Sequence, residues 1–299
     1  MHILVREMRS LLAALLALPV LVIAAVYTYR GVIPLVLQDV TNATDSERSS
    51  GALAFMHLPK CGGTSLWRLI HTQATKNGKH PFVLVPKGPH WMQISQEERD
   101  ETDVFGSDHI NYHTLLRSWP TRAGNAEFVT ILRDPRQRLA SHYFFVKKDP
   151  SHHTYPFVVN RTFAEFVRDI SPGYYLQFFL PPGTFHHLEG PGGELRLCCF
   201  QQNNVEEVKA LLRERFAVVG TLEQLNKTLE VLKCNVPWID PAASIGHLMQ
   251  TEHAMPPFDE EDMIRATSMD QELYDAATQL LHEQYLECQQ NHSQDSAPQ

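Results

Sequence analysis

The chain is poor in cysteine and in positive charge. Its 299 residues include five cysteines, and no two of them form the C-x-x-C pair that is typical of structural zinc sites. We therefore expect no metal site. The 26 Lys and Arg residues are outnumbered by 34 Asp and Glu residues, which gives a formal net charge of -8. This balance argues against a nonspecific nucleic-acid binder but leaves room for a local basic cleft.

Charged residues are also missing from one long stretch near the N-terminus. Residues 11–29 are 19 uncharged, mainly apolar residues between arginines, long enough for a helix to span the hydrocarbon core of a bilayer. We predict a transmembrane signal anchor here, with residues 1–10 as a cytosolic tail, since basic residues precede the span. Residues 30–51 would form a lumenal stem. A cleavable signal peptide and a buried helix are the alternatives, although the stretch is longer than a usual signal-peptide core.

Several features downstream of this stretch are typical of the secretory pathway. The cysteines suit an oxidising lumen, and we expect Cys234 to form a disulfide bond with Cys198 or Cys199. Four N-x-[ST] tripeptides are candidate glycosylation sites on the lumenal side. Their asparagines are Asn42, Asn160, Asn226 and Asn291.

Apolar runs alternate with helical patterns between residues 52 and 288. This alternation predicts an α/β domain with a central parallel sheet flanked by helices. The polar residues 289–299 predict a disordered tail. The expected strands are 53–58, 82–85, 127–132 and 217–220, and the expected helices are 64–75, 135–148, 205–216, 222–232 and about 260–288.

The first strand-to-helix junction reads FMHLPKCGGTSL (55–66). Its glycine pair permits a tight turn, and Thr64 or Ser65 can cap a helix whose free N–H groups face the loop. Such N–H groups, together with a lysine charge, make an anion site. A Walker A loop has its lysine after the glycines, whereas here the lysine precedes them, so an ATP or GTP site is disfavoured. The residues of this predicted phosphate cradle are Pro59, Lys60, Cys61, Gly62, Gly63, Thr64 and Ser65.

A second junction, EFVTILRDPRQRLAS (127–141), begins another predicted helix. Asp134 and Pro135 form an N-cap and first-turn pair, so Arg133 stands between the end of a strand and the start of that helix. A guanidinium in this place can bind a second phosphate with its planar fork, and Ser141 can donate its hydroxyl from two turns further on. We therefore predict that Arg133 and Ser141 bind a second phosphate group.

In this order, the two junctions resemble those of the membrane-bound Golgi carbohydrate sulfotransferases, most closely the enzymes of the heparan sulfate 2-O- and 6-O-sulfotransferase type. The family motifs H-x-P-K-[TC]-[GA]-[GS]-T-[ST] and R-D-P-x-x-R-x-x-S appear at residues 57–65 and 133–141. The resemblance implies a P-loop-like sulfotransferase fold over residues 52–288 and the sulfate donor 3′-phosphoadenosine 5′-phosphosulfate. It also implies that the first motif binds the 5′-phosphosulfate, with Lys60 as a catalytic residue, and that the second binds the 3′-phosphate.

The family's acid/base residue lies between these motifs, usually as a histidine after a segment that ends in glycine. In VFGSDHINYHTLL (104–116), His109 resembles that position. A base must accept the proton of a sugar hydroxyl as its oxygen attacks sulfur, and histidine titrates near ambient pH. His113 is the main alternative. Further candidates are Glu127, His71 and His90.

Together these features predict a single-pass type II Golgi membrane protein that transfers a sulfuryl group to a hydroxyl of a glycan. A glycosaminoglycan-like polysaccharide is the expected acceptor. Its partners would be that glycan and the Golgi membrane, and homo-oligomer formation is left open. Segment 244–253 lacks the lysines and arginines of heparan-type relatives, so the acceptor sugar is also left open. The alternatives are a catalytically silent glycan-binding relative and a lumenal nucleotide kinase.

Overall fold

The computed structural model describes residues 52–84, 95–109, 111–120, 122–189, 195–240, 242–245 and 254–295. The chain divides into two units, Met1–Ser49 and Ser50–Gln299, and every described residue belongs to the second. The expected cytosolic tail, signal anchor and stem, together with Asn42 and His90, lie outside the described residues. Among the residues that are described, no helix is both long and apolar enough to cross a membrane.

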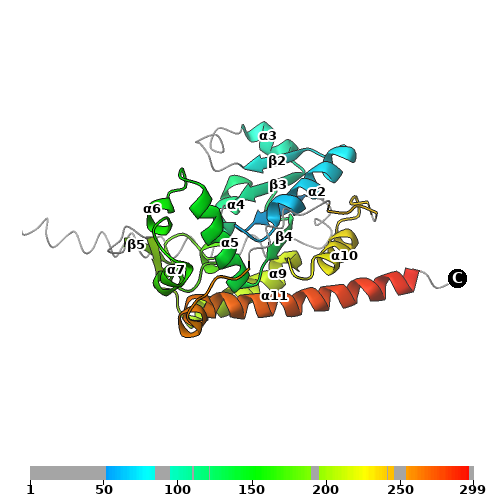
Figure 1. The fold of residues 1–299 in the computed structure, drawn as a ribbon. Coiled ribbons are helices and arrows are strands. Elements are labelled where there is room, and N and C mark those ends of the chain that lie inside the picture. Colours follow the sequence, from blue (N-terminus) through cyan, green and yellow to red (C-terminus); the bar gives the residue numbers. More distant parts are fainter. Residues whose placement is uncertain are drawn as a thin grey trace, which may run out of the picture. The chain divides into compact units, whose positions relative to one another are not determined.

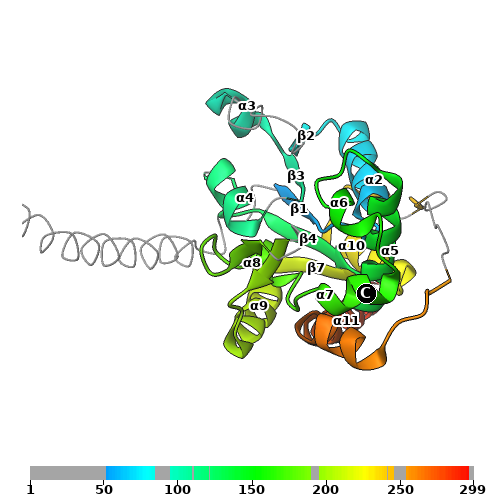
Figure 2. The same ribbon diagram turned by 60° about the vertical axis from the view of Figure 1, so that its left-hand side comes forward.

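A parallel sheet forms the centre of the second unit (Figure 1, Figure 2). Its strands are β1 (Leu53–His57), β2 (Pro81–Leu84), β3 (Val104–Asp108), β4 (Glu127–Leu132) and β7 (Phe216–Thr221). The strand order is β2-β3-β1-β4-β7, and every neighbouring pair is parallel. The predicted central parallel sheet is therefore confirmed. The sequence pattern missed β3 because only two apolar residues precede its glycine.

Helices cover both faces of this sheet (Figure 1). The covering helices are α2 (Gly63–Lys76) and α10 (Leu225–Asn235) on one face, and α4 (Tyr112–Ser118) and α9 (Gln202–Arg215) on the other. α11 (Glu260–Asp295) packs along the edge strand β7 and contributes buried residues to the core on both faces. Side chains alternate along β1, so Leu53 and Phe55 pack under the first pair while Ala54 and Met56 pack under the second group. Both faces are therefore buried, as is usual for a parallel sheet.

A third apolar cluster lies where the helix after β4 packs against the start of α11. Its helices are α5 (Pro135–Lys148), α6 (Tyr155–Val158) and α7 (Phe163–Asp169). The remaining described elements are α3 (Gln96–Glu101), α8 (Leu176–Phe179) and an antiparallel pair of strands, β5 (His186–Glu189) and β6 (Leu195–Cys198). The start and end of α5 are those predicted from the sequence.

Two expectations about the C-terminal region are wrong. Cys234 forms its disulfide bond with Cys288, not with Cys198 or Cys199. The reason is that α10 and α11 pack side by side, which brings the two Cα atoms to 6.0 Å although 54 positions separate them in sequence. In addition, α11 continues to Asp295, so residues 289–295 are helical rather than a disordered tail.

Candidate active site

The carboxyl ends of three strands bring the predicted site residues to one edge of the sheet. His57 is paired with Asp108, so His109 emerges directly beside the end of β1. On the other side of β1, β4 ends at Leu132 and Arg133 follows. The chain runs from β1 to β2 and β3 on one side and then crosses to β4 on the other, which makes the β1–β4 boundary a topological switch point. Ligands of open α/β sheets bind at such points.

The loop after β1 is shaped by its two glycines. Gly62 is the N-cap of α2 and has a φ of 81°, in the left-handed region that favours glycine. A Cβ atom on Gly63 would collide with the ring of His57, so glycine lets that ring lie against the loop. The expected capping of α2 by Thr64 or Ser65 is wrong, because no side chain caps the helix and its first turn has no acidic residue. Its first N–H groups are left for a ligand or water.

The N-terminus of α5 provides a contrast. Asp134 is its N-cap, as predicted, and accepts a hydrogen bond from the N–H of Gln137 at 2.9 Å. Glu223, which follows β7, accepts one from the N–H of Asp134 at 3.0 Å. Two carboxylates of the protein therefore occupy this helix end. The helix N–H groups that can receive a bound anion are therefore those of α2 rather than those of α5.

Lys60 and Arg133 bring two positive charges together beside the open end of α2. Nη1 of Arg133 donates a hydrogen bond to the carbonyl oxygen of Lys60 at 3.4 Å. Burial, and then the charge of Arg133, lowers the pKa of Lys60. Within the described part of the chain, neither side chain forms an ion pair, and Nζ of Lys60 lies 4.0 Å from the ring centroid of Phe145. An anion placed here would stabilise both cations.

The backbone at two of the predicted catalytic residues is strained. Among described non-glycine residues, positive φ values occur at Lys60 (66°), His109 (65°) and Cys199 (78°). The left-handed conformation costs an L-residue about 1–2 kcal/mol. Residues held in this way concentrate at functional sites. Two of these three are the residues that the sequence identifies as catalytic.

The candidate bases lie in different places. His109 is exposed, its N–H donates to the carbonyl oxygen of His57 at 3.3 Å, and the two ring centroids are 5.2 Å apart. His113 lies in the first turn of α4, where burial lowers its pKa. Glu127 is the first residue of β4, at the opposite edge of the sheet, and His71 lies in the third turn of α2. The fold thus brings His109 to the loop after β1 and keeps Glu127 away from it.

Cys61 is a packed side chain within the loop. It is fully buried, and burial raises the pKa of its thiol to about 11. Reactive cysteines are partly exposed and have lowered pKa values, so this environment is that of an inert thiol. Pro59 beside it is also buried.

The remaining predicted residues are accessible to different degrees. Ser141 lies two turns into α5, as predicted, and is half-buried. The sequon asparagines Asn160, Asn226 and Asn291 are all exposed, which glycosylation requires.

Sequence reasoning did not assign a role to a buried polar group behind the loop. The hydroxyl of Tyr175 contacts both Cys61 and Arg133. Arg138 is 2% exposed, its guanidinium lies 3.7 Å from the ring centroid of Tyr174, and its Nε and Nη1 have no hydrogen-bond partner among the described residues. Arg138 is the second arginine of the R-D-P-x-x-R motif, which was a usable signal. Nothing in the sequence distinguishes Tyr175 from an ordinary core aromatic.

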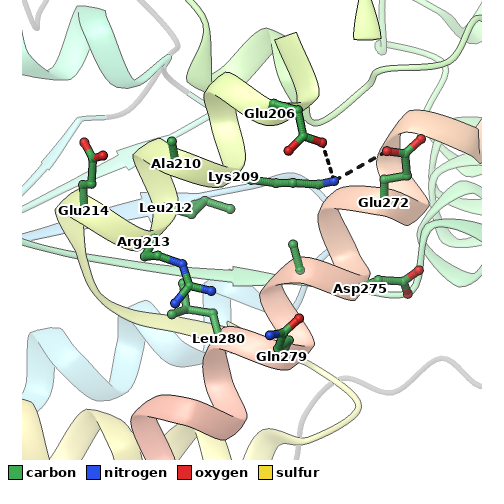
Figure 3. A pocket seen from close by; sticks show the side chains of 11 residues that line it. Glu206, Lys209, Ala210, Leu212, Arg213, Glu214, Glu272, Asp275, Gln279 and Leu280 are labelled. Carbon is green, nitrogen blue, oxygen red and sulfur yellow. Dashed lines mark hydrogen bonds and ion pairs between the residues drawn. The ribbon is translucent and has the colours of Figure 1, made fainter. Parts of the chain in front are cut away.

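A groove of about 630 Å³ lies elsewhere, between α9 and α11, and contains none of the predicted site residues (Figure 3). Its cations are already neutralised. Nζ of Lys209 lies 2.8 Å from Glu206 and 3.5 Å from Glu272, and Nη1 of Arg213 lies 2.6 Å from Glu283. The groove therefore lacks the uncompensated positive charge that Lys60 and Arg133 provide.

The sheet edge thus combines an anion site with a neighbouring pair of histidines, an arrangement suited to group transfer from a polyanionic donor. The chain matches no family model and no curated protein.

Proposed function

We propose that the protein transfers a sulfuryl group from 3′-phosphoadenosine 5′-phosphosulfate to a hydroxyl of a glycosaminoglycan-like glycan in the Golgi lumen, with a sulfotransferase fold. The observation that carries this proposal is the pair Lys60–Arg133 beside the uncapped end of α2, at the switch point of the sheet. A ligand with several phosphate or sulfate groups suits this site. The motif resemblance supplies the identity of the donor, and the Cys234–Cys288 disulfide bond supports an oxidising compartment.

In the proposed reaction, the acceptor oxygen bonds to sulfur while the bond from sulfur to the bridging oxygen of the 5′-phosphate breaks. The electron pair of the broken bond stays on the phosphate, and the hydroxyl proton passes to a base. Lys60 and the N–H groups of α2 stabilise the charge that develops on the leaving phosphate. Arg133 and Ser141 hold the 3′-phosphate, so catalysis is mainly positioning and charge stabilisation.

His109 is the base in this proposal. It is exposed at the sheet edge, where a polymeric acceptor can approach, and its backbone is bound to that of His57. The ring of His57 lies against Gly63, so the histidine pair adjoins the phosphate loop. These contacts support His109 over His113, which is partly buried in α4.

Binding of the desulfated product, 3′-phosphoadenosine 5′-phosphate, to the full-length protein tests the donor site. Calorimetry should show saturable binding by the wild type. Lys60→Ala and Arg133→Ala should each weaken it by roughly 10- to 150-fold, because each removes a hydrogen bond to a charged group worth about 1.5–3 kcal/mol. Arg68→Ala is the matched control, since Arg68 is an exposed cation in the middle of α2, and should bind like the wild type. Absence of saturable binding by the wild type would refute the proposal.

Transfer of labelled sulfate to heparan, chondroitin and neutral glycans tests the chemistry. His109→Ala should abolish transfer while its affinity for the product nucleotide stays unchanged. Full activity of this variant would remove His109 from the mechanism. If the wild type binds the nucleotide but labels no glycan, the catalytically silent alternative is the better description.

A further inference from the structure

We infer that Tyr175 is a positioning residue that holds the two phosphate-binding segments at a fixed separation. Its hydroxyl donates a hydrogen bond to the carbonyl oxygen of Arg133 at 2.6 Å and lies 3.5 Å from Sγ of Cys61. One buried oxygen therefore contacts the loop after β1 and the segment after β4. The inference rests on the proposed function for its ligand and on these contacts for its geometry.

The hydroxyl of Tyr175 both donates and accepts hydrogen bonds in this place. A tyrosine hydroxyl has one hydrogen to donate and two lone pairs to accept with. The short bond to the Arg133 carbonyl takes the hydrogen. The N–H of Arg133 donates to the hydroxyl at 3.4 Å. Sγ of Cys61 lies 3.5 Å from the same oxygen, and the thiol also donates to the carbonyl oxygen of Pro59 at 3.5 Å. Tyr175 is 0% exposed, so bulk solvent does not reach its hydroxyl.

The backbone of Tyr175 is itself fixed by the C-terminal helix. Asp270 of α11 accepts hydrogen bonds from the N–H groups of Tyr174 at 3.1 Å and Tyr175 at 2.8 Å. Asp270 is 1% exposed, and burial raises its pKa to about 6, although the nearby charge of Arg138 acts to lower it. A rigid chain of contacts therefore runs from α11 through Tyr175 to both anion-binding segments.

The contacts of Tyr175 reach the chain beside both cations, Lys60 and Arg133. The side chain of Arg133 begins at the residue whose N–H and carbonyl group both bind Tyr175, and Cys61 directly follows Lys60. Loss of the hydroxyl frees both segments on the side away from the ligand. The two cations would then have to be ordered when the polyanion binds, which weakens binding without removing any group that touches it.

Tyr175→Phe tests the inference because it deletes only the hydroxyl. Affinity for 3′-phosphoadenosine 5′-phosphate should fall by roughly three- to tenfold, the equivalent of one neutral hydrogen bond. Tyr143→Phe is the matched control, because Tyr143 is also buried and its hydroxyl donates to the carbonyl oxygen of Arg161 at 2.7 Å. The melting temperature of Tyr143→Phe should fall by an amount similar to that of Tyr175→Phe, while its nucleotide affinity stays unchanged.

Hydrogen exchange of the intact protein gives a readout that needs no ligand. Tyr175→Phe should speed exchange in peptides covering residues 59–62 and 131–134, whereas Tyr143→Phe should not. Asp270→Asn, which keeps one acceptor oxygen, should shift exchange in the same segments and serves if Tyr175→Phe does not fold. Unchanged exchange in both segments overturns the inference. If the wild type does not bind the nucleotide, the proposed function fails while the exchange result still decides the role of Tyr175.

Discussion

The left-handed backbone at His109 can be tested by comparing His109→Gly with His109→Ala. Both variants lose the imidazole and its contact with His57, so their difference reports mainly on the backbone. At a φ of 65°, alanine keeps the steric cost of an L-residue and glycine does not. We therefore expect the glycine variant to be the more stable of the two, which is the reverse of the usual order.

The size of the difference follows from two opposing quantities. The left-handed conformation costs an L-residue about 1–2 kcal/mol. Glycine loses about 0.5–1 kcal/mol through the greater freedom of its unfolded chain. The free energy of unfolding of His109→Gly should therefore exceed that of His109→Ala by up to about 1.5 kcal/mol. The centre of the two ranges gives about 0.75 kcal/mol, or about 1.5–3 °C in melting temperature for a domain of this size.

Arg68 provides a control with the opposite sign. It is exposed in the middle of α2, where glycine is about 1 kcal/mol less favourable than alanine. Urea unfolding of the four variants should therefore show glycine above alanine at position 109 and below it at position 68. The same order at both positions would refute the left-handed backbone at His109. If His109 is the base that we propose, sulfate transfer should be lost in both variants at position 109.

Three further changes have defined outcomes. Iodoacetamide at pH 7.5 should not label Cys61 in the folded protein, because burial raises the pKa of the thiol to about 11; rapid native labelling would contradict its packed position. Burial, and then the charge of Arg138, lowers the pKa of His142 to about 3, so the unfolded state binds a proton that the folded state does not as pH falls through 6.5. Between pH 6.5 and 4.5, the free energy of unfolding of the wild type should therefore fall by roughly 2–3 kcal/mol more than that of His142→Phe. Urea unfolding at both pH values measures this difference, and an identical pH slope in the two proteins would contradict it. Replacing Cys234 and Cys288 by serine opens a loop of 54 residues and should cost about 4 kcal/mol by chain entropy, which thermal unfolding of the oxidised wild type and the double variant would measure.

The parallel sheet could be predicted because its central strands are apolar on both faces. The runs 53–58 and 127–132 became β1 and β4, within one residue at each end. β3 could not be found this way, since its sequence VFGSD has neither alternation nor a continuous apolar run. It is a strand because β1 and β2 bind it from both sides. Pairing with neighbouring strands, rather than the local sequence pattern, therefore determines that these residues form a strand.

The site was predictable only where a residue type has one common use. Lys60 beside paired glycines indicated an anion site, and Arg133 before Asp-Pro indicated a helix start. The disulfide partner of Cys234 was not predictable, because it depends on the packing of α10 against α11. Tyr175 was not predictable either, because its role lies in one hydroxyl oxygen and its sequence neighbours are also aromatic.

The order of lysine and glycines in PKCGGTS has a structural reason. A lysine that followed the glycines would occupy position 64, in the first turn of α2, where the side chain is exposed. Lys60 instead turns the chain at the end of β1 with a φ of 66°, and its carbonyl oxygen binds the guanidinium of Arg133. The lysine therefore lies in the loop after β1, beside the segment that follows β4, rather than on a helix. The resulting site has cations on two sides of the β1–β4 boundary, which suits a ligand with separated anionic groups better than a single triphosphate chain.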